Sequence, residues 1–318
     1  MIMIMNSKNG VTMKRIVISM LAATSLLAGC SKEEEINKID STIKIKAEMG
    51  FDDITRTTIV KDEDGNYLAR WTEDDRYLVS LLCIENDPDD NGSLGMVVAT
   101  GIELINEGEK ATFEFTMYSD FDADNFIFVG MNSFPAYSFN SSMIKYKLKN
   151  EQTQDWLGYY DAQADLFVSK PIEAERPTGD ARMNFTMTRL NALLELSFKN
   201  LVLDDGDKVI SVTFACEHPL AGLISFNLSD LDGVTYPIPY TLVDDGINSI
   251  TLTGVHKAPY YISTLPATLK AGEEYTITIE TQMATYTKSS TLPSDLELKM
   301  GDITRVTANM ATATKVVK

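Results

Sequence analysis

The strongest constraint on the fold is an alternation of apolar and polar residues that begins near residue 41. Apolar residues occupy every second position from Ile43 to Met49, with polar or charged residues between them. A β-strand points alternate side chains to opposite faces, so this spacing predicts a strand with one buried face. No stretch carries the apolar spacing and end caps of a long α-helix. Similar alternation predicts further strands at 77–84, 96–105, 112–118, 125–131, 143–148, 183–188, 192–201, 209–216, 223–228, 249–253, 260–264, 275–283 and 303–310.

Clusters of Asp, Asn and Gly separate the predicted strands, as at residues 204–207 and 244–246. These residue types tolerate the left-handed backbone of tight turns. Many short strands joined by such turns predict an all-β chain built from β-sandwiches. The segment 170–181 contains two prolines, a glycine and few apolar residues, which is typical of a linker. We therefore expect two tandem β-sandwich domains, transthyretin-like or Greek-key in type, at residues 41–176 and 177–318.

The amino-terminal residues have the features of a secretory signal. Two basic residues precede an apolar run, 16–28, that is shorter than the roughly 20 residues needed to cross a bilayer. The run ends in Leu27-Ala28-Gly29-Cys30, which resembles the lipobox of bacterial lipoproteins. This resemblance implies cleavage after residue 29 and lipidation of Cys30, whose thiol is nucleophilic enough to take a thioether-linked lipid. We expect a signal peptide at 1–29, with Met13 as an alternative start, and a lipidated linker at 30–40.

The residues that follow this cysteine, 31–35, are Ser-Lys-Glu-Glu-Glu. They resemble the lysine-plus-acid signal that sends lipoproteins of the Bacteroidales to the outer face of the outer membrane. An ordinary solvated linker has a similar composition, so both interpretations stay open here. In either case we expect a lipid-anchored protein, with the cell outer membrane as its location.

The charge balance is strongly acidic. Residues 1–29 contain three of the 28 Lys and Arg residues and none of the 46 Asp and Glu residues, so the mature formal charge is −21. Such a field repels phosphate backbones, and we expect no nucleic-acid partner. Apart from Cys30, the chain has only Cys83 and Cys216, each within an apolar run. Their spacing favours two buried thiols over a disulfide.

No residue pattern marks a catalytic or metal site. His218 and His256, the only histidines, do not have the spacing of a zinc motif. The sequence also lacks the glycine-rich nucleotide loops and the nucleophile elbow. Residues 87–92 match the first positions of a calcium loop, but Val98 stands where the bidentate glutamate belongs. We therefore expect no enzyme activity, no cofactor and no metal.

One group of aromatic residues could serve as a ligand platform. Glycan-binding sandwiches often present flat aromatic side chains, and Trp156, Tyr159 and Tyr160 lie close together in the sequence. Core packing is the alternative for these residues, as it is for Trp71.

Several local patterns, taken in order, resemble the fimbrillin family of the Bacteroidales. The likeness runs from Cys30 to near the carboxyl terminus, and Arg189 departs from it because the family often has histidine there. The matching segments are Thr55-Arg56-Thr57-Thr58, Trp71 before the apolar run 77–84, residues 164–168 (Ala-Asp-Leu-Phe-Val), Phe185-x-Met187-x-Arg189-Leu190-x-Ala192-x-Leu194, and residues 298–306 (Leu-Lys-Met-Gly-Asp-Ile-Thr-Arg-Val).

The resemblance implies a surface-anchored pilus or adhesin subunit. In this family an arginine-specific protease removes the lipidated end together with the first strand, and the carboxyl-terminal strand of a neighbouring subunit fills the vacated groove. The expected partners are other pilus subunits, in a homopolymer or heteropolymer, the outer membrane, and a host or bacterial surface ligand. The residues concerned would be the displaced strand Ile43, Ile45, Ala47 and Met49, the cleavage candidates Arg56 and Arg70, and the donor candidates Val306, Ala308, Met310 and Val316, which share one face of an extended run.

Other interpretations stay open at this stage. If Arg56 is an ordinary solvated residue, residues 303–317 complete their own sheet and the protein is an uncut anchor or accessory subunit. A glycan-binding outer-membrane lipoprotein of a nutrient-uptake system would share the signal and the sandwiches. A secreted hydrolase would need a cleft with two acids about 5 to 10 Å apart, and the sequence marks no such pair.

Overall fold

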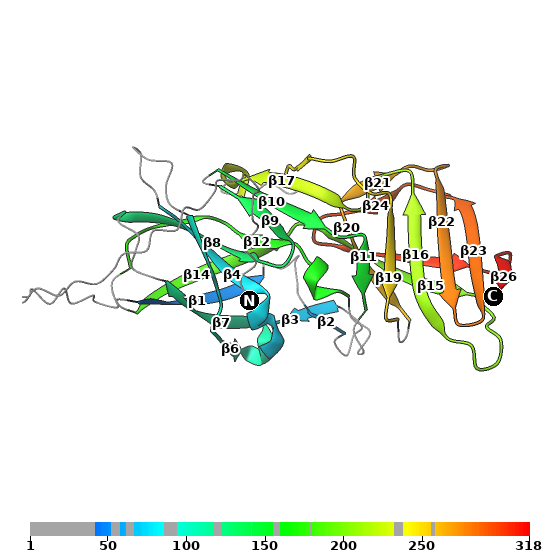
Figure 1. Cartoon of the computed structure of the whole chain (residues 1–318), viewed down its shortest axis with the longest axis horizontal. Helices are drawn as coiled ribbons and strands as arrows, with labels where there is room; N and C mark the ends of the chain where they lie inside the picture. Colours follow the sequence, from blue (N-terminus) through cyan, green and yellow to red (C-terminus); the bar gives the residue numbers. More distant parts are fainter. Residues whose placement is uncertain are drawn as a thin grey trace, which may run out of the picture. The chain divides into compact units, whose positions relative to one another are not determined.

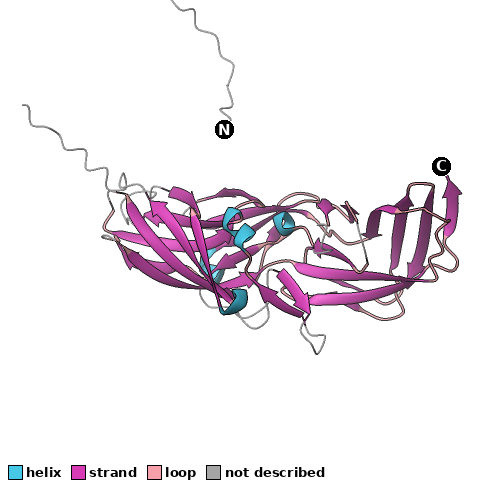
Figure 2. Ribbon diagram, turned by 90° about the horizontal axis from the view of Figure 1, so that it is seen from below, coloured by secondary structure: helices cyan, strands magenta, loops and turns pink. Residues whose placement is uncertain are grey.

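The structure is a computed structural model that describes residues 42–51, 58–61, 67–85, 94–117, 123–140, 142–154, 160–177, 180–231, 238–255 and 258–318. Strands dominate these segments, and the helices among them are short 3-10 turns (Figure 2). The all-β prediction is therefore confirmed. The turns are η1 (Glu73–Tyr77), η2 (Asn106–Gly108), η3 (Ala162–Ala164) and η4 (Leu228–Leu231).

The largest sheet has nine strands and carries the first described strand in its interior (Figure 1). Two residues, Ala99 and Thr100, join β5 to β6, although these strands lie at opposite ends of the sheet order. The sheet must therefore curl until its two ends approach each other. Its order is β5 (Leu94–Val98), β4 (Val79–Glu85), β8 (Asn125–Asn132), β12 (Phe167–Ser169), β14 (Ala181–Arg189), β1 (Ile43–Phe51), β7 (Lys110–Met117) and β6 (Gly101–Ile105), with β13 (Ile172–Glu175) paired to β8.

The inside of this curled sheet holds an aromatic-rich core, which we call the inner core. Apolar residues at alternate positions reach it because successive side chains on a strand point to opposite faces. On β4, Leu81 and Cys83 belong to the inner core, whereas Leu82 and Ile84 face a second core outside the sheet. The buried inner-core residues are Ile43, Ile45, Ala47, Met49, Trp71, Val79, Leu81, Cys83, Ala99, Ala111, Phe113, Phe115, Met117, Phe126, Phe128, Phe167, Phe185 and Met187.

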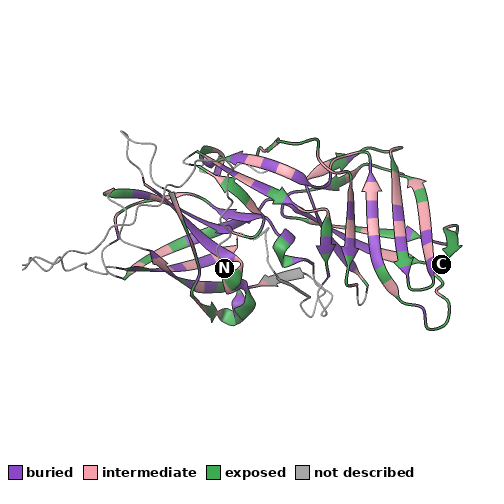
Figure 3. Cartoon of the chain, viewed as in Figure 1, coloured by how far each residue is buried: buried purple, intermediate pink, exposed green. Residues whose placement is uncertain are grey.

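Most of the remaining strands form smaller sheets around the second core. Buried positions alternate with partly or fully exposed ones along many of them (Figure 3). The six-stranded sheet is β11 (Glu151–Thr153), β19 (Ser249–Thr253), β16 (Val209–Cys216), β22 (Glu274–Thr281), β23 (Ala284–Thr291) and β26 (Thr314–Val317). The others are β18 (Thr241–Leu242), β17 (Gly222–Asn227), β10 (Met143–Leu148) and β9 (Ala136–Phe139); β20 (Tyr260–Thr264), β15 (Ala192–Lys199) and β25 (Ile303–Asn309); β2 (Thr58–Lys61) with β3 (Tyr67–Arg70); and β21 (Ala267–Leu269) with β24 (Leu296–Leu298).

Strand pairing crosses the predicted domain boundary after residue 176 in both directions. β14 lies beyond the boundary but pairs with β1, while β10 and β11 precede it but pair with β17 and β19. The second core likewise contains residues from Leu82 to Met310. Within the predicted linker, β13 pairs with β8. The division into two domains stays a prediction.

Several predicted strands differ by one or two residues at their ends, and two differences change the path of the chain. The predicted strand 96–105 is divided into β5 and β6, because Ala99 N donates to Val79 O and Thr100 N donates to Glu114 O at the bend between them. Tyr77, predicted to begin a strand, instead ends the 3-10 turn η1 and is exposed.

Candidate functional site

The first candidate site is the position that β1 occupies in the nine-stranded sheet. β1 runs parallel to β14, with Ile45 opposite Ala181, and antiparallel to β7, with Ile43 opposite Met117. A strand with partners on both sides has its backbone hydrogen bonds satisfied within the sheet. Removal of β1 would therefore leave two unpaired edges, those of β14 and β7, facing each other across an empty slot.

The inner face of β1 fills this slot with apolar side chains. Ile45, Ala47 and Met49 are fully buried, and Ile43 is 7% exposed. Burial of a side chain the size of Ile or Met stabilises a fold by about 1.5–3 kcal/mol. The fit is close at Met49, because a Cβ added to Gly130 would lie 3.0 Å from Met49 Cε.

Trp71 closes the slot beside Met49. Its indole Nε1 donates a hydrogen bond to Met49 O at 3.0 Å, and its ring makes edge contacts with Phe113 and Phe167 at centroid distances of 5.0 and 5.8 Å. Backbone packing is tight here: Gly108 has φ +89°, and a Cβ on it would lie 2.3 Å from Trp71 O. Trp71 is therefore a core residue, which settles the alternative left open for it.

The outer face of β1 carries exposed ion pairs to β7. Lys46 Nζ lies 2.9 Å from Glu114 Oε1, and Lys110 Nζ lies 2.8 Å from Glu48 Oε1. The hydrogen bond between Lys46 and Glu114 raises the pKa of the lysine and lowers the pKa of the carboxyl. Exposed pairs add little stability, so the inner face holds β1 in place more than the outer face does.

The two predicted cleavage residues lie between β1 and Trp71 in the sequence. Arg56 lies outside the described residues. Arg70 ends β3, where its Nη1 donates to Asn106 O at 2.8 Å and lies 3.4 Å from Glu109 Oε1. A protease that takes the arginine side chain into a pocket would have to break these contacts. Cleavage at either residue stays a prediction.

The predicted donor segment is divided between two strands instead of forming one extended run. The first part, β25, runs parallel to β15 at the edge of the three-stranded sheet. Ala308 and Met310 are 3% and 4% exposed in this chain's own core, and Val306 is half-buried. Release of this part would therefore expose apolar surface.

The second part of the donor segment, β26, is held much less firmly. It follows a turn in which Ala313 N donates to Met310 O at 3.0 Å, and it pairs with β23 alone at the edge of the six-stranded sheet (Figure 1). Val316 and Val317 are 61% and 69% exposed. The role of Val306, Ala308, Met310 and Val316 as donor residues stays a prediction.

A buried ion-pair cluster that was not predicted from the sequence lies at the end of β14. Arg189 is 1% exposed, and its Nε donates to Asp165 Oδ1 at 2.6 Å. Its Nη2 donates to Tyr160 Oη at 3.0 Å, and that hydroxyl donates to Asp165 Oδ2 at 2.8 Å. Burial lowers the pKa of the Arg189 guanidinium, but the charge of Asp165 raises it, and the pKa is raised overall. Burial and the charge of Asp165 both raise the pKa of Tyr160. The available signal was a charged residue inside each of two apolar runs.

This cluster bears on the predicted aromatic platform. Tyr160 is 5% exposed and its hydroxyl is committed to the cluster, so its ring does not face solvent. Trp156 and Tyr159 lie outside the described residues.

A second buried acid lies in η1. Asp75 is 5% exposed, and its carboxylate accepts hydrogen bonds from Thr72 N at 2.6 Å and from the Thr72 hydroxyl at 3.1 Å. Burial raises the pKa of Asp75 to about 6, because desolvation disfavours the ionised form more than these bonds favour it.

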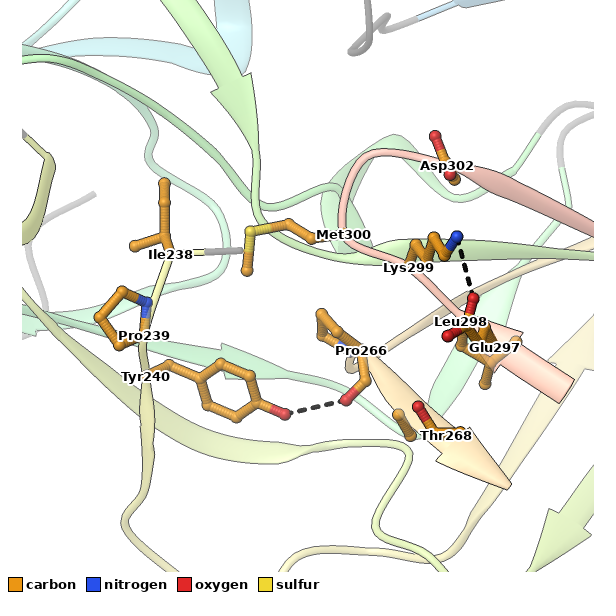
Figure 4. Close-up of a pocket in the computed structure, with 11 residues that line it drawn as sticks. Ile238, Pro239, Tyr240, Pro266, Thr268, Glu297, Leu298, Lys299, Met300 and Asp302 are labelled. Carbon is orange, nitrogen blue, oxygen red and sulfur yellow. Dashed lines mark hydrogen bonds and ion pairs between the residues drawn. The ribbon is translucent and has the colours of Figure 1, made fainter. Parts of the chain in front are cut away.

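A cavity of about 760 Å³ lies in the second half of the chain (Figure 4). Tyr240 lines it and donates its hydroxyl to Pro266 O at 3.0 Å. At its wall, Lys299 Nζ lies 2.9 Å from Glu297 Oε2. The other lining residues are Ile238, Pro239, Ala267, Thr268, Leu298, Met300 and Asp302.

The remaining candidates are structural or fall outside the described residues. Cys83 and Cys216 are free, buried thiols, as predicted, and burial raises the pKa of Cys83 to about 12. His218 Nε2 lies 2.9 Å from Glu273 Oε2. His256, Cys30 and the calcium-like loop 87–92 lie outside the described residues, and within those residues no cluster of His, Cys, Asp and Glu could hold a metal. The described part of the chain also has no helix with the length and apolar character of a membrane span.

No family model and no curated protein matches the chain. Its structure is similar to that of a candidate cell adhesion protein from Bacteroides uniformis, with 15% identity, a TM-score of 0.48, and coverage of 88% of this chain and 97% of the other. A candidate cell adhesion protein from Bacteroides ovatus has 13% identity, a TM-score of 0.46 and coverage of 87% and 96%. A fimbrial assembly protein from Parabacteroides distasonis has 12% identity, a TM-score of 0.42 and coverage of 87% and 95%. At these identities and TM-scores, a function can be inferred only from the chain's own residues.

Proposed function

We propose that the chain is a lipid-anchored surface subunit of fimbrillin type that assembles into pili or adhesive polymers by strand exchange. The observation that carries this proposal is the position of β1. It is the first described strand, yet it occupies an interior place in the nine-stranded sheet and its inner face is buried. A single cut between β1 and Trp71 would separate this strand from the strands that follow it. A strand that has other strands of its sheet on both sides in the sequence could not be separated by one cut.

Loss of β1 would leave a surface that must be covered. The inner-core side chains that β1 covers include Phe113, Phe115 and Phe185. The edges of β14 and β7 would also be unpaired, and exposed strand edges beside apolar surface readily take up another strand. The cleaved subunit therefore favours a donor strand from a second copy.

The carboxyl-terminal segment repeats the inner-face pattern of β1. Because volume-conserving apolar exchanges are well tolerated in cores, a donor that ran in the direction of β1 would fit the same slot. In this register Ala308 takes the place of Ala47, and Asn309 takes the place of Glu48. The matched inner-face residues are Ile45, Ala47 and Met49 in β1 and Val306, Ala308 and Met310 in the donor.

The two parts of the donor would be released at different cost. β26 has one partner strand and exposed side chains, so its detachment from β23 exposes little apolar surface. Release of β25 and the residue that follows it gives up the burial of Ala308 and Met310, which the slot of the next subunit would restore. This balance supports initial contact through β26 followed by transfer of β25.

The anchor follows from the lipobox-like sequence. Lipidation of Cys30 would hold the uncut subunit at the outer membrane until a protease separates β1 and the lipid from the rest. A Cys30→Ser protein would then partition with the aqueous phase of a detergent extraction. Partition of this variant with the detergent, like the native protein, would argue against the anchor.

Proteolytic assembly tests the central proposal. Protein comprising residues 30–318 with Cys30→Ser, treated with an arginine-specific protease, should form a ladder of oligomers on size-exclusion chromatography. Arg56→Ala or Arg70→Ala should abolish the ladder, whichever is the cleavage residue, and Arg182→Ala serves as the control because it removes an exposed arginine within β14. Complete cleavage that leaves a stable monomer would contradict assembly by strand exchange.

A further inference from the structure

The exposed aromatic side chains of the described residues gather in one region. They are Tyr77, Phe134 and Tyr137, at 55%, 50% and 63% exposure. Ser133 N donates to Leu78 O at 2.9 Å. Tyr77 precedes Leu78 and Phe134 follows Ser133, so this hydrogen bond brings the two aromatic residues near each other. Exposed rings gathered in this way usually mark a binding surface, since isolated exposure needs no explanation but a patch does.

Phe134 and Tyr137 line a hollow of about 260 Å³. Its other walls come from Pro135, Ala136, Lys147, Lys149 and Gln163. Tyr137 belongs to β9, which lies at the edge of the four-stranded sheet. Lys147 belongs to β10, and the pairing of β9 with β10 therefore holds the two residues on neighbouring strands. We call this site the aromatic–lysine hollow.

Two lysines, Lys147 and Lys149, line this hollow, although the mature chain is strongly acidic. Lys149 Nζ lies 2.7 Å from Asp161 Oδ2, and this carboxylate offsets the charge of Lys149. Lys147 is exposed and forms no ion pair with the described residues. The Arg76 guanidinium lies 4.4 Å from the centroid of the Tyr77 ring, and its Nε is buried without a hydrogen-bond partner in the described part of the chain.

We propose that the aromatic–lysine hollow binds a sugar acid, a carboxylate-bearing sugar within a sparsely charged glycan. The apolar face of a sugar ring packs against an aromatic side chain, and the carboxylate forms a charge-assisted hydrogen bond with Lys147. An acidic peptide without aromatic residues offers the charge but no ring to pack against Phe134 or Tyr137. A nucleic acid offers both, but its dense phosphate charge is repelled by the acidic remainder of the protein.

This site is independent of assembly, because its residues lie outside the β1 slot and the carboxyl-terminal strands. It would give the subunit a ligand whether or not the subunit polymerises. The uncleaved protein is therefore the right material for the test, and failure of either proposal leaves the other standing.

Calorimetric titration of uncleaved residues 30–318, with Cys30→Ser, tests the proposal. The probes are sialyllactose, a glucuronic-acid disaccharide and neutral lactose. We expect at least one sugar acid to bind about tenfold more tightly than lactose. Tyr137→Ala should weaken binding of that sugar acid about tenfold, and Lys147→Ala should remove the preference over lactose. Val202→Ala and Lys199→Ala are the controls, because both residues are exposed and lie elsewhere.

Three outcomes would overturn the proposal. In the first, the sugar acids bind no more tightly than lactose or do not bind. In the second, Tyr137→Ala and Lys147→Ala both bind the sugar acid as tightly as the unsubstituted protein does. In the third, an acidic peptide or single-stranded DNA binds at the same residues more tightly than the sugar acid. If Tyr137→Ala lowers the unfolding temperature, Lys147→Glu replaces it, since this exposed side chain supports no described ion pair. That reversal of charge should abolish the preference for the acid and leave lactose binding unchanged.

Discussion

At the residue scale, Met49 ties β1 to the rest of the fold. Its side chain is fully buried against Gly130, and its carbonyl accepts the hydrogen bond from the Trp71 indole. A buried residue with both kinds of contact contributes strongly to stability, and its contribution is lost when β1 leaves. The same residue therefore stabilises the uncut subunit and defines the shape that a donor must match.

Met49→Ala should lower the free energy of unfolding by about 2–5 kcal/mol, because it removes buried apolar atoms and leaves a cavity. Urea unfolding of the uncleaved protein measures this change. Lys44→Ala is the matched control on the same strand, since Lys44 is exposed and its loss should change the free energy by less than about 0.5 kcal/mol. Equal effects of the two substitutions would contradict the account of the inner face.

A second prediction at this scale concerns pH. The pKa of Asp75 is raised to about 6, so the folded state prefers the protonated acid. The resulting stabilisation is present in full below the unfolded pKa, near 4, and is lost as the pH rises through 6. The stability of the wild type relative to Asp75→Asn should therefore increase on acidification from pH 7 to pH 4, by up to about 3 kcal/mol.

Urea unfolding of both proteins at the two pH values measures this difference. Asp74→Asn, at an exposed position of the same turn, is measured alongside as the control. The prediction is contradicted if the stability difference between wild type and Asp75→Asn is the same at both pH values, or if the wild type loses stability relative to the variant at low pH. Either result would show that the pKa of Asp75 is not raised in the folded state.

At the element scale, alternation in the sequence predicted β1 and its buried face correctly. The match is close because one face of β1 is apolar and the other is charged, with Lys46 and Glu48 paired outward. The parallel pairing of β1 with β14 could not be predicted, since it joins segments far apart in the sequence and depends on the fold of the whole sheet. β23 was missed because Thr and Ser fill most of its positions and only Ala284 and Tyr286 are buried.

The carboxyl-terminal segment was predicted as one extended run because its apolar residues keep one spacing. The fold separates it into β25 and β26 through the turn at Met310 and Ala313, and these two strands join different sheets. The buried ion pair of Arg189 and Asp165 was missed for a related reason: sequence patterns assign charged residues to the surface, and only tertiary structure reveals a partner.

A synthetic peptide of residues 302–318 tests the fit of the donor to the slot. The peptide should bind the cleaved subunit and block ladder formation. An Ala308→Phe peptide should fail, because the large ring cannot enter the Ala47 position, whereas Thr307→Phe should still bind, because Thr307 would face outward in this register. Size-exclusion chromatography measures both outcomes. Equal inhibition by the two variant peptides would contradict the register.

At the scale of the whole molecule, the two halves of the sequence share sheets and a core. Residues Asp40–Lys318 form one compact unit, and β14 completes the sheet that holds β1. A boundary after residue 176 would divide that sheet. The linker prediction came from local composition, which carries no information about strand pairing across the chain.

A fragment of residues 41–176 should therefore be less stable than one of residues 41–189, which restores β14 beside β1. Thermal unfolding followed by circular dichroism measures the difference, with the full-length protein as reference. A fragment 41–176 that unfolds cooperatively at the same temperature as the longer fragment would support two separable domains at the predicted boundary.

The most direct test of strand exchange is a disulfide between donor and acceptor. In β1, Glu48 lies opposite Thr112 of β7, so a donor in the proposed register places Asn309 opposite Thr112. Opposite residues on antiparallel strands have Cα atoms about 4.5–5.5 Å apart, within the range that a disulfide spans. The control pair is Asn309 with Thr116, which lies opposite Lys44.

After arginine-specific cleavage and oxidation, the protein with Asn309→Cys and Thr112→Cys should form a covalent ladder on non-reducing gels. The uncleaved protein should not, because β1 still fills the slot, and the variant with Asn309→Cys and Thr116→Cys should remain uncrosslinked. A cleaved Asn309/Thr112 variant that stays monomeric, or a Thr116 control that forms the same ladder, would contradict the proposed strand exchange.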